Sequence, residues 1–263
     1  MCIRDRAGLL ERNKEGSWVF VRFASGEQAE RVAALLDLES EPAVDMARLE
    51  EVRQERVRAA EDYFSAHADD WDRLRKLHVA DSEVEARILA LLSGRPIGRL
   101  LDIGTGTGRM LELLGPQAAE AVGIDRSADM LRAARGKLEA AGLGNCPVRQ
   151  GDMQALPSPE GAADTVVLHQ VLHFAERPGA AVREAARVLA PGGRLLIADF
   201  APHEREELRK EHAHMRLGFD EELVCTWLKQ AGLTPYEPEH LEGDLTVTIW
   251  TADKPGGEAR QVA

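Results

Sequence analysis

Hydrophobic and polar positions alternate in blocks from Arg99 onward. Short apolar runs such as RLLDIG, AEAVGID, ADTVVLHQ and RLLIADF are separated by amphipathic runs such as SADMLRAARGKLEAAG and PGAAVREAARVLAPGG. A short apolar run is typical of a buried strand, and an amphipathic run is typical of a helix on the surface of a domain. This order predicts an α/β fold with a doubly wound parallel sheet and helices on both of its faces.

Capping residues and side-chain alternation add detail to this prediction. Ser127 is a suitable N-cap for the helix that follows it, and Gly142 is a suitable end for the same helix. DEELVCTWLKQAG, residues 220–232, predicts a second capped amphipathic helix. LTVTIWTA, residues 245–252, alternates as an edge strand does.

The first 95 residues follow a different pattern. GLLERNKEGSWVFVRFA places two β-prone runs around the turn signal NKEG and predicts a hairpin. A helical segment follows, and then a charged amphipathic run from Asp45 to about Leu77 contains no glycine or proline. We expect this run to form a dimerisation or bridging helix, part of which can be a kinked connector. The expected divisions of the chain are residues 1–44, 45–80, 81–252 and a frayed tail, 253–263.

Composition narrows the classes of partner. The chain has 263 residues, 44% of them hydrophobic, and 33 basic against 45 acidic side chains give a net charge of −12. A net negative charge repels nucleic acid, which favours small-molecule partners. The three cysteines, Cys2, Cys146 and Cys225, form no CxxC pair, so neither a disulfide framework nor a zinc site is predicted. With no signal peptide and no run of roughly 18 apolar residues, we expect a cytoplasmic protein without a membrane partner.

The stretch LLDIGTGTGR, residues 100–109, carries the strongest chemical signal. Glycines at alternate positions after a strand let backbone N–H groups approach a ligand closely. A dinucleotide-binding GxGxxG pattern would need its third glycine at Arg109, and the GK[ST] ending of a P-loop is absent. Asp102, two residues ahead of the first glycine, suits a cationic ligand end better than a pyrophosphate.

Two more acids end the next predicted strands. Asp125 lies about 20 residues further on, where a carboxylate can accept hydrogen bonds from ribose hydroxyls. Asp152 in RQGDM can meet an exocyclic amine such as that of adenine, and Met153 offers an apolar contact to the ring. The three acids and the glycine loop together predict an adenosine-containing ligand.

These motifs resemble the class I S-adenosylmethionine-dependent methyltransferases over roughly Asp81 to Ala252. DIGTGTG matches that family's glycine loop, Asp125 its ribose acid, Asp152 its adenine acid and LAPGGRLLIAD its turn before the fifth strand. The resemblance implies a seven-stranded Rossmann-like sheet whose last strand is antiparallel, with cofactor and substrate over the carboxyl ends of the strands. The alternative is that these are ordinary βα turns of another doubly wound protein. The residues expected to bind S-adenosylmethionine are Asp102, Gly104, Thr105, Gly106, Gly108, Asp125, Arg126, Met130, Asp152, Met153 and His169.

A sulfonium methyl donor needs an acceptor held in line with its methyl carbon, and a general base only if the acceptor arrives protonated. His169, His173 and His214 are the candidate acceptor-side residues, and the spacing of the first two predicts one shared helix face. Each can equally be a structural histidine. His212 and His214 could chelate a metal, but no supporting cysteine or carboxylate spacing exists, so no metal site is predicted. Further histidine and aromatic candidates for substrate contact or for a lid over the cofactor, with ordinary helix packing as the alternative, are His203, Tyr63, Phe64 and Trp71.

The acceptor class is narrowed by what the chain lacks. The [ND]PP[YF] tetrapeptide of nucleic-acid amino-methyltransferases is replaced by LHQV, and the cysteine cluster needed for arsenite methylation is absent. A small-molecule oxygen, nitrogen or carbon acceptor remains, in the style of quinone-biosynthesis methyltransferases, which VLHQVLHF and REAARVLAPGG also resemble.

The stretch from about Ala7 to Leu38, which contains the predicted hairpin, resembles the end of the recognition helix and the wing of ArsR/SmtB-type winged-helix regulators. The first division, residues 1–44, is therefore expected to be a truncated α+β winged-helix fragment, because the helices that precede the wing in that family are missing here. A complete version is expected to bind DNA as a homodimer through its N-terminal helices, with Arg12, Lys14 and Arg22 near phosphates. The alternative is a simple hairpin.

Two functions remain open at this point. One is an enzyme that methylates a small metabolite, and the other is a regulator whose methyltransferase-like domain only senses S-adenosylmethionine or S-adenosylhomocysteine. An open acceptor pocket lined by His169, His173 and His214 would favour the enzyme, and a filled pocket would favour the sensor.

Overall fold

The computed structural model describes residues 10–15, 18–23, 48, 51, 58, 60, 62–68, 71 and 81–256. The chain divides into two compact units, Met1–Glu55 and Arg56–Ala263. In the first unit, β1 (Leu10–Glu15) pairs antiparallel with β2 (Trp18–Phe23), with Glu15 opposite Trp18. This confirms the predicted hairpin, although β1 extends into the expected NKEG turn. The helical segment expected after the hairpin, residues 25–39, and most of the amphipathic run from Asp45 to about Leu77 lie outside the described residues.

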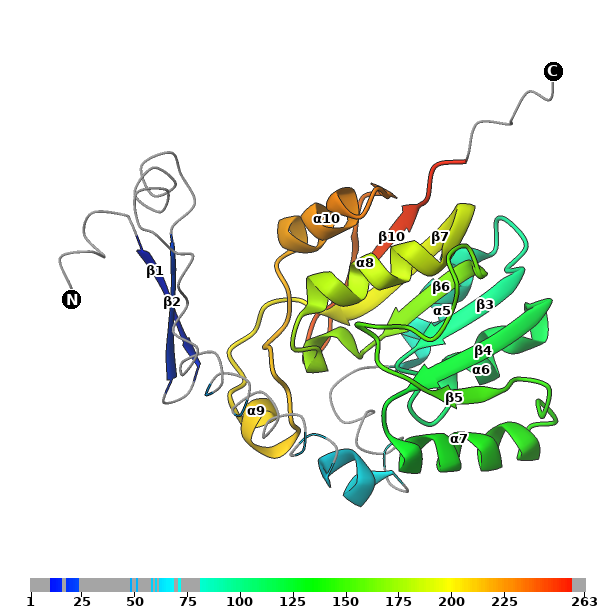
Figure 1. The fold of residues 1–263 in the computed structure, drawn as a ribbon, viewed down its shortest axis with the longest axis horizontal. Helices are drawn as coiled ribbons and strands as arrows, with labels where there is room; N and C mark the ends of the chain where they lie inside the picture. Colours follow the sequence, from blue (N-terminus) through cyan, green and yellow to red (C-terminus); the bar gives the residue numbers. More distant parts are fainter. Residues whose placement is uncertain are drawn as a thin grey trace. The chain divides into compact units, whose positions relative to one another are not determined.

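The second unit contains a twisted sheet of eight strands in the order β5-β4-β3-β6-β7-β10-β8, with β9 also paired to β10 (Figure 1). The five strands from β5 to β7 are parallel, and β10 is antiparallel to β7. This confirms the Rossmann-like sheet and its antiparallel last strand. The strands are β3 (Arg99–Ile103), β4 (Glu120–Asp125), β5 (Val148–Gln150), β6 (Ala163–His169), β7 (Leu189–Phe200), β8 (Thr234–Pro235), β9 (Glu239–Leu241) and β10 (Val247–Asp253).

The outer part of this sheet differs from the expectation in two ways. The expected count of seven strands becomes eight, because β8 and β9 are two short strands that both pair with β10. The expectation of an edge strand at 245–252 is wrong, since β10 lies between β7 and these two strands and is buried from Val247 to Ala252. Its threonines are buried along with its apolar residues. The alternation of polar and apolar residues therefore did not indicate which side chains are exposed.

Helices cover both faces of the sheet, as predicted. Residues of α8 and α10 belong to one apolar core, and residues of α5, α6 and α7 belong to the core on the other face. Ser127 Oγ accepts from the Met130 N–H at 3.3 Å and Asp220 caps α10, which confirms both predicted N-caps. Among the described residues no helix is both long and apolar enough to cross a membrane. The helices are α5 (Asp81–Leu92), α6 (Arg109–Leu114), α7 (Ala128–Ala140), α8 (Pro178–Val188), α9 (Glu207–Glu211) and α10 (Glu221–Gln230), with 3-10 turns η1 (Gly115–Gln117) and η2 (Leu172–Phe174).

Candidate functional site

The loop between β3 and α6, Gly104–Gly108, forms one wall of the candidate site. All three of its glycines have positive φ, at 72°, 52° and 88° for Gly104, Gly106 and Gly108. A Cβ on Gly104 would lie 2.1 Å from Val171 Cγ2, whereas a Cβ on Gly106 would meet only Trp71 Nε1 at 3.7 Å. Gly104 is therefore required for packing, and Gly106 leaves its backbone open to a ligand.

Two carboxylates hold this loop in place. Thr105 Oγ1 donates to Asp102 Oδ2 at 2.6 Å, and Asp102 is buried at the end of β3. Asp125, the last residue of β4, accepts from the Gly106 N–H and from the Ser127 N–H, both at 2.8 Å. A carboxylate has about four lone-pair sites, so Asp125 keeps capacity for a ligand hydroxyl. The two strand ends and the loop are thus organised before any ligand binds.

Asp125 also has an unusual electrostatic environment. Burial raises the pKa of its carboxyl group above the ordinary value for aspartate. The backbone N–H groups of Ser127, Gly106 and Arg126 oppose this effect because they stabilise the ionised form. A carboxylate with a raised pKa is a strong hydrogen-bond acceptor when it is ionised.

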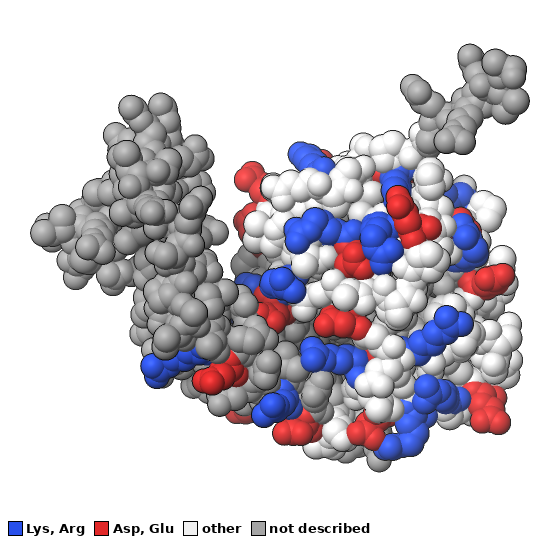
Figure 2. Space-filling model, viewed as in Figure 1, with Lys and Arg blue, Asp and Glu red and all other residues white. Residues whose placement is uncertain are grey.

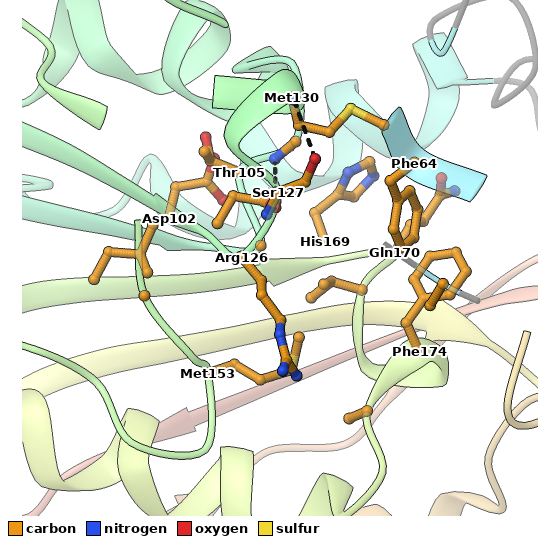
Figure 3. Close-up of a pocket in the computed structure, with 18 of the residues that line it drawn as sticks. Phe64, Asp102, Thr105, Arg126, Ser127, Met130, Met153, His169, Gln170 and Phe174 are labelled. Carbon is orange, nitrogen blue, oxygen red and sulfur yellow. Dashed lines mark hydrogen bonds between the residues drawn. The ribbon is translucent and has the colours of Figure 1, made fainter. Parts of the chain in front are cut away.

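A cavity of about 1190 Å³, part of it open solvent, lies over the carboxyl ends of β3, β4 and β6 (Figure 3). Gly108 does not line it. A Cβ there would lie 3.4 Å from Ala134 Cβ, which places this glycine against α7. The remaining residues predicted to bind the cofactor do line the cavity: Asp102, Gly104, Thr105, Gly106, Asp125, Arg126, Met130, Asp152, Met153 and His169.

Comparison with known proteins assigns the fold around this cavity. Residues 101–197 match the family described as "Methyltransferase domain". The demethylmenaquinone methyltransferase of Thermus thermophilus is 40% identical over 144 residues, which are 53% of this chain and 64% of that protein. This chain contains a class I S-adenosylmethionine-dependent methyltransferase domain.

Two further relatives agree with this assignment. The malonyl-[acyl-carrier protein] O-methyltransferase of Legionella pneumophila is 36% identical over 151 residues, 56% of this chain and 51% of that protein. The YcgJ protein of Bacillus subtilis has the same fold, with a TM-score of 0.60 at 18% identity over 67% of this chain and 100% of that one. The chain spans about half the length of the curated relatives it matches. The family match does not include the hairpin of β1 and β2, so the winged-helix resemblance stays a prediction.

The three candidate acceptor-side histidines separate into two groups. His169 ends β6 and lines the cavity. His173 and His214 stack on each other with ring centroids 4.1 Å apart, and neither is among the lining residues. The expectation that His169 and His173 share one helix face is wrong, because the strand ends at His169 and a 3-10 turn begins only at Leu172.

His173 is fixed by an acid that the sequence analysis did not single out. His173 Nδ1 lies 2.7 Å from Asp199 Oδ1, and both side chains are almost fully buried. Asp199 also accepts from the backbone N–H groups of Leu172, His173 and Phe200. This pair ties η2 to the end of β7 directly behind the cavity wall.

Aromatic side chains cover the cavity. Phe64 and Trp71 line it and pack on Phe174, with Phe64 and Phe174 centroids 4.9 Å apart. Tyr63 Oη lies 2.8 Å from His212 Nδ1, and Ser65 donates to Asp129. Among the described residues no group of three potential metal ligands comes together, and this includes His212 and His214.

Several lining residues were not singled out from the sequence. No sequence motif marked them. Some belong to loops without a glycine motif, and others are apolar and look like ordinary core residues. Phe174 stands next to the quoted LHQVLHF histidines, which was the one available signal. The missed residues include Gln154, Gln170, Phe174, Glu176 and Met215, and Ser127, predicted only as an N-cap, also lines the cavity.

Proposed function

We propose that this chain transfers the methyl group of S-adenosylmethionine to a small-molecule acceptor. The observation that carries the proposal is the cavity at the strand ends, where open backbone at Gly106 adjoins the Asp125 carboxylate. Open backbone admits a bulky ligand, and a carboxylate with unused lone pairs suits a sugar diol. The residues therefore fit an adenosyl cofactor.

The cofactor side of the cavity comprises Asp102, Gly106, Asp125 and Asp152 with their neighbours. In the proposal Asp125 accepts from the ribose hydroxyls, and Asp152 accepts from the exocyclic amine of the base. Met130 and Met153 supply apolar contacts to the base, because a thioether packs well on an aromatic ring. Asp102 lies nearest the cationic methionine end, and exposed Arg126 borders the cavity.

The acceptor side comprises His169, Gln170, Phe174 and Met215. Bound S-adenosylmethionine supplies a methyl group on a sulfonium, so an acceptor lone pair forms the new bond while the C–S bonding electrons pass to sulfur. His169 is proposed to hold the acceptor or to take its proton, and the aromatic cover excludes water. His173 and His214 are proposed as positioning residues, because they lie behind the wall that His169 lines.

A matched pair of variants tests the cofactor side. Asp125→Ala should weaken S-adenosylhomocysteine binding by at least about 100-fold, because two hydrogen bonds to a charged acceptor are lost at about 1.5–3 kcal/mol each. Glu120→Ala, at the exposed opposite end of β4, should leave the affinity unchanged. Calorimetry measures both, and circular dichroism confirms that each variant is folded. Equal affinity of Asp125→Ala and the unmodified protein would contradict the proposed site.

Charge supports a small acceptor. On the face drawn in Figure 2, basic and acidic side chains of the described residues are interspersed rather than gathered by sign. This face therefore has no extended positive potential that would attract a polyanion. Two relatives are named for methylation of demethylmenaquinone and of malonyl-[acyl-carrier protein]. A methyl-release assay against extracted metabolites identifies the acceptor.

The hairpin of β1 and β2 favours a second function. It has the antiparallel pairing of a wing, with Arg12 opposite Val21 and Glu11 opposite Arg22. In this alternative the chain belongs to an ArsR-type regulator that senses S-adenosylmethionine or S-adenosylhomocysteine and binds DNA as a homodimer. Cofactor binding without methyl release to any extracted metabolite would favour the sensor over the enzyme.

A further inference from the structure

Gln170 occupies a strained position on the acceptor side of the cavity. Its φ is 50°, a left-handed conformation that only one other non-glycine residue, Ala213, adopts in the described part of the chain. Its backbone N–H donates to the Ala198 carbonyl at 2.7 Å, which fixes Gln170 between β6 and η2. A non-glycine residue keeps this conformation at a cost in stability, and such strain is concentrated at functional sites.

The side-chain amide nitrogen of Gln170 also has no hydrogen-bond partner among the described residues. Gln170 is 8% exposed, and its Nε2 is buried. Orphaned N–H groups are rarer in proteins than under-satisfied carbonyl oxygens, because a carbonyl has two lone pairs and tolerates the loss of one contact. Gln170 lines the cavity, so a change in its side-chain torsions can present the NH₂ group to a ligand there.

The surroundings of Gln170 indicate which ligand would receive that N–H group. Figure 3 shows His169, Gln170, Phe64 and Phe174 grouped at one end of the cavity, away from Asp102 and Met153. The two phenylalanine rings meet edge to face, 4.9 Å between centroids, and present apolar surface. A flat apolar ring fits such a surface, and an oxygen on that ring supplies the lone pair that an NH₂ donor needs.

We propose that Gln170 is a specificity-determining residue that donates a hydrogen bond to an oxygen on an apolar, ring-bearing methyl acceptor. The proposal rests on the function proposed above and narrows its substrate class from any small molecule to an aryl alcohol or a related ring oxygen. In this proposal the acceptor oxygen supplies the hydrogen-bond partner that Gln170 Nε2 has not found among the described residues. An acceptor without this oxygen leaves the donor orphaned and binds less tightly.

The test uses the full chain loaded with S-adenosylhomocysteine, with 1-naphthol and naphthalene as probes. The loaded protein should bind 1-naphthol about fivefold to tenfold more tightly than naphthalene, the contribution of one neutral hydrogen bond. Gln170→Leu should abolish that preference and leave the affinity for S-adenosylhomocysteine within twofold. Gln117→Leu, an exposed glutamine in η1, should change neither affinity. Fluorescence titration measures the naphthyl probes and calorimetry measures the cofactor product.

Each other outcome has a defined meaning. A preference for 1-naphthol that persists in Gln170→Leu would overturn the proposal, and so would equal binding of both probes by the unmodified protein. A parallel loss of S-adenosylhomocysteine affinity would assign Gln170 to the cofactor instead. If Gln170→Leu does not fold, Gln170→Met carries the test, because it removes both amide groups at a similar side-chain length and should lower 1-naphthol affinity as far. Failure of the unmodified protein to bind S-adenosylhomocysteine would contradict the proposed function itself.

Discussion

The two sides of the cavity are built in opposite ways. On the cofactor side, Asp125 is held by the N–H groups of Gly106 and Ser127, and Asp102 accepts from Thr105. On the acceptor side, Gln170 combines a left-handed backbone with a buried amide nitrogen that has no partner among the described residues. The first side is organised before binding, and the second retains unmet hydrogen-bonding capacity. We therefore expect the acceptor side, rather than the cofactor side, to select among ligands by hydrogen bonding.

The largest expected effect comes from the pair behind the acceptor side. His173→Ala leaves the Asp199 carboxylate buried with only its backbone donors, which should lower the free energy of unfolding by about 3 kcal/mol. Chemical denaturation measures this, and calorimetry should show a much smaller change in S-adenosylhomocysteine affinity. A stable variant that loses turnover alone would instead place His173 on the substrate.

Two glycines sharpen the contrast within the cofactor side. Gly104→Ala should destabilise the protein by about 2–3 kcal/mol, because its Cβ would collide with Val171 in addition to the left-handed strain. Gly106→Ala should cost about 1 kcal/mol of stability but weaken cofactor binding, because its Cβ projects into open space. Thermal unfolding and calorimetry on both variants separate packing from binding. Identical behaviour of the pair would contradict the separation.

The glycine loop and the acids at the ends of β4 and β5 could be predicted because each depends on a few neighbouring residues. His173 and Asp199 are 26 residues apart, so no local pattern reported their pairing. The left-handed turn at Gln170 could not be predicted either, because no glycine or asparagine occupies that position. The two- and three-residue strands β8 and β9 are too short to show a periodicity, and β10 was therefore taken for an edge.

Acid should weaken the cofactor side in a defined direction. The pKa of Asp125 is raised by burial, so protonation begins at a higher pH than for an ordinary aspartate. Affinity for S-adenosylhomocysteine should be full above that pKa and fall about tenfold for each pH unit below it. Calorimetry from neutral to mildly acidic pH follows the loss. Asp125→Asn should bind weakly at every pH and show no such decline.

The smallest expected effect is a gain in stability. Gln170→Gly relieves the left-handed strain and removes the orphaned amide, which should raise the free energy of unfolding by about 1 kcal/mol. Thermal unfolding measures it, and the preference for 1-naphthol should vanish in the same variant. A loss of stability would show that the Gln170 side chain supports the fold rather than the ligand.

The position of β10 has a consequence for how the domain forms during synthesis. Every other strand of the sheet precedes it in the chain, yet β8, β9 and the outer edge of β7 all depend on it for pairing. Until Val247–Asp253 has left the ribosome, the outer edge of β7 exposes unpaired N–H and C=O groups that can recruit another nascent chain. The methyltransferase sheet is therefore completed late in synthesis, and we expect chaperones to bind it mainly just before β10 emerges.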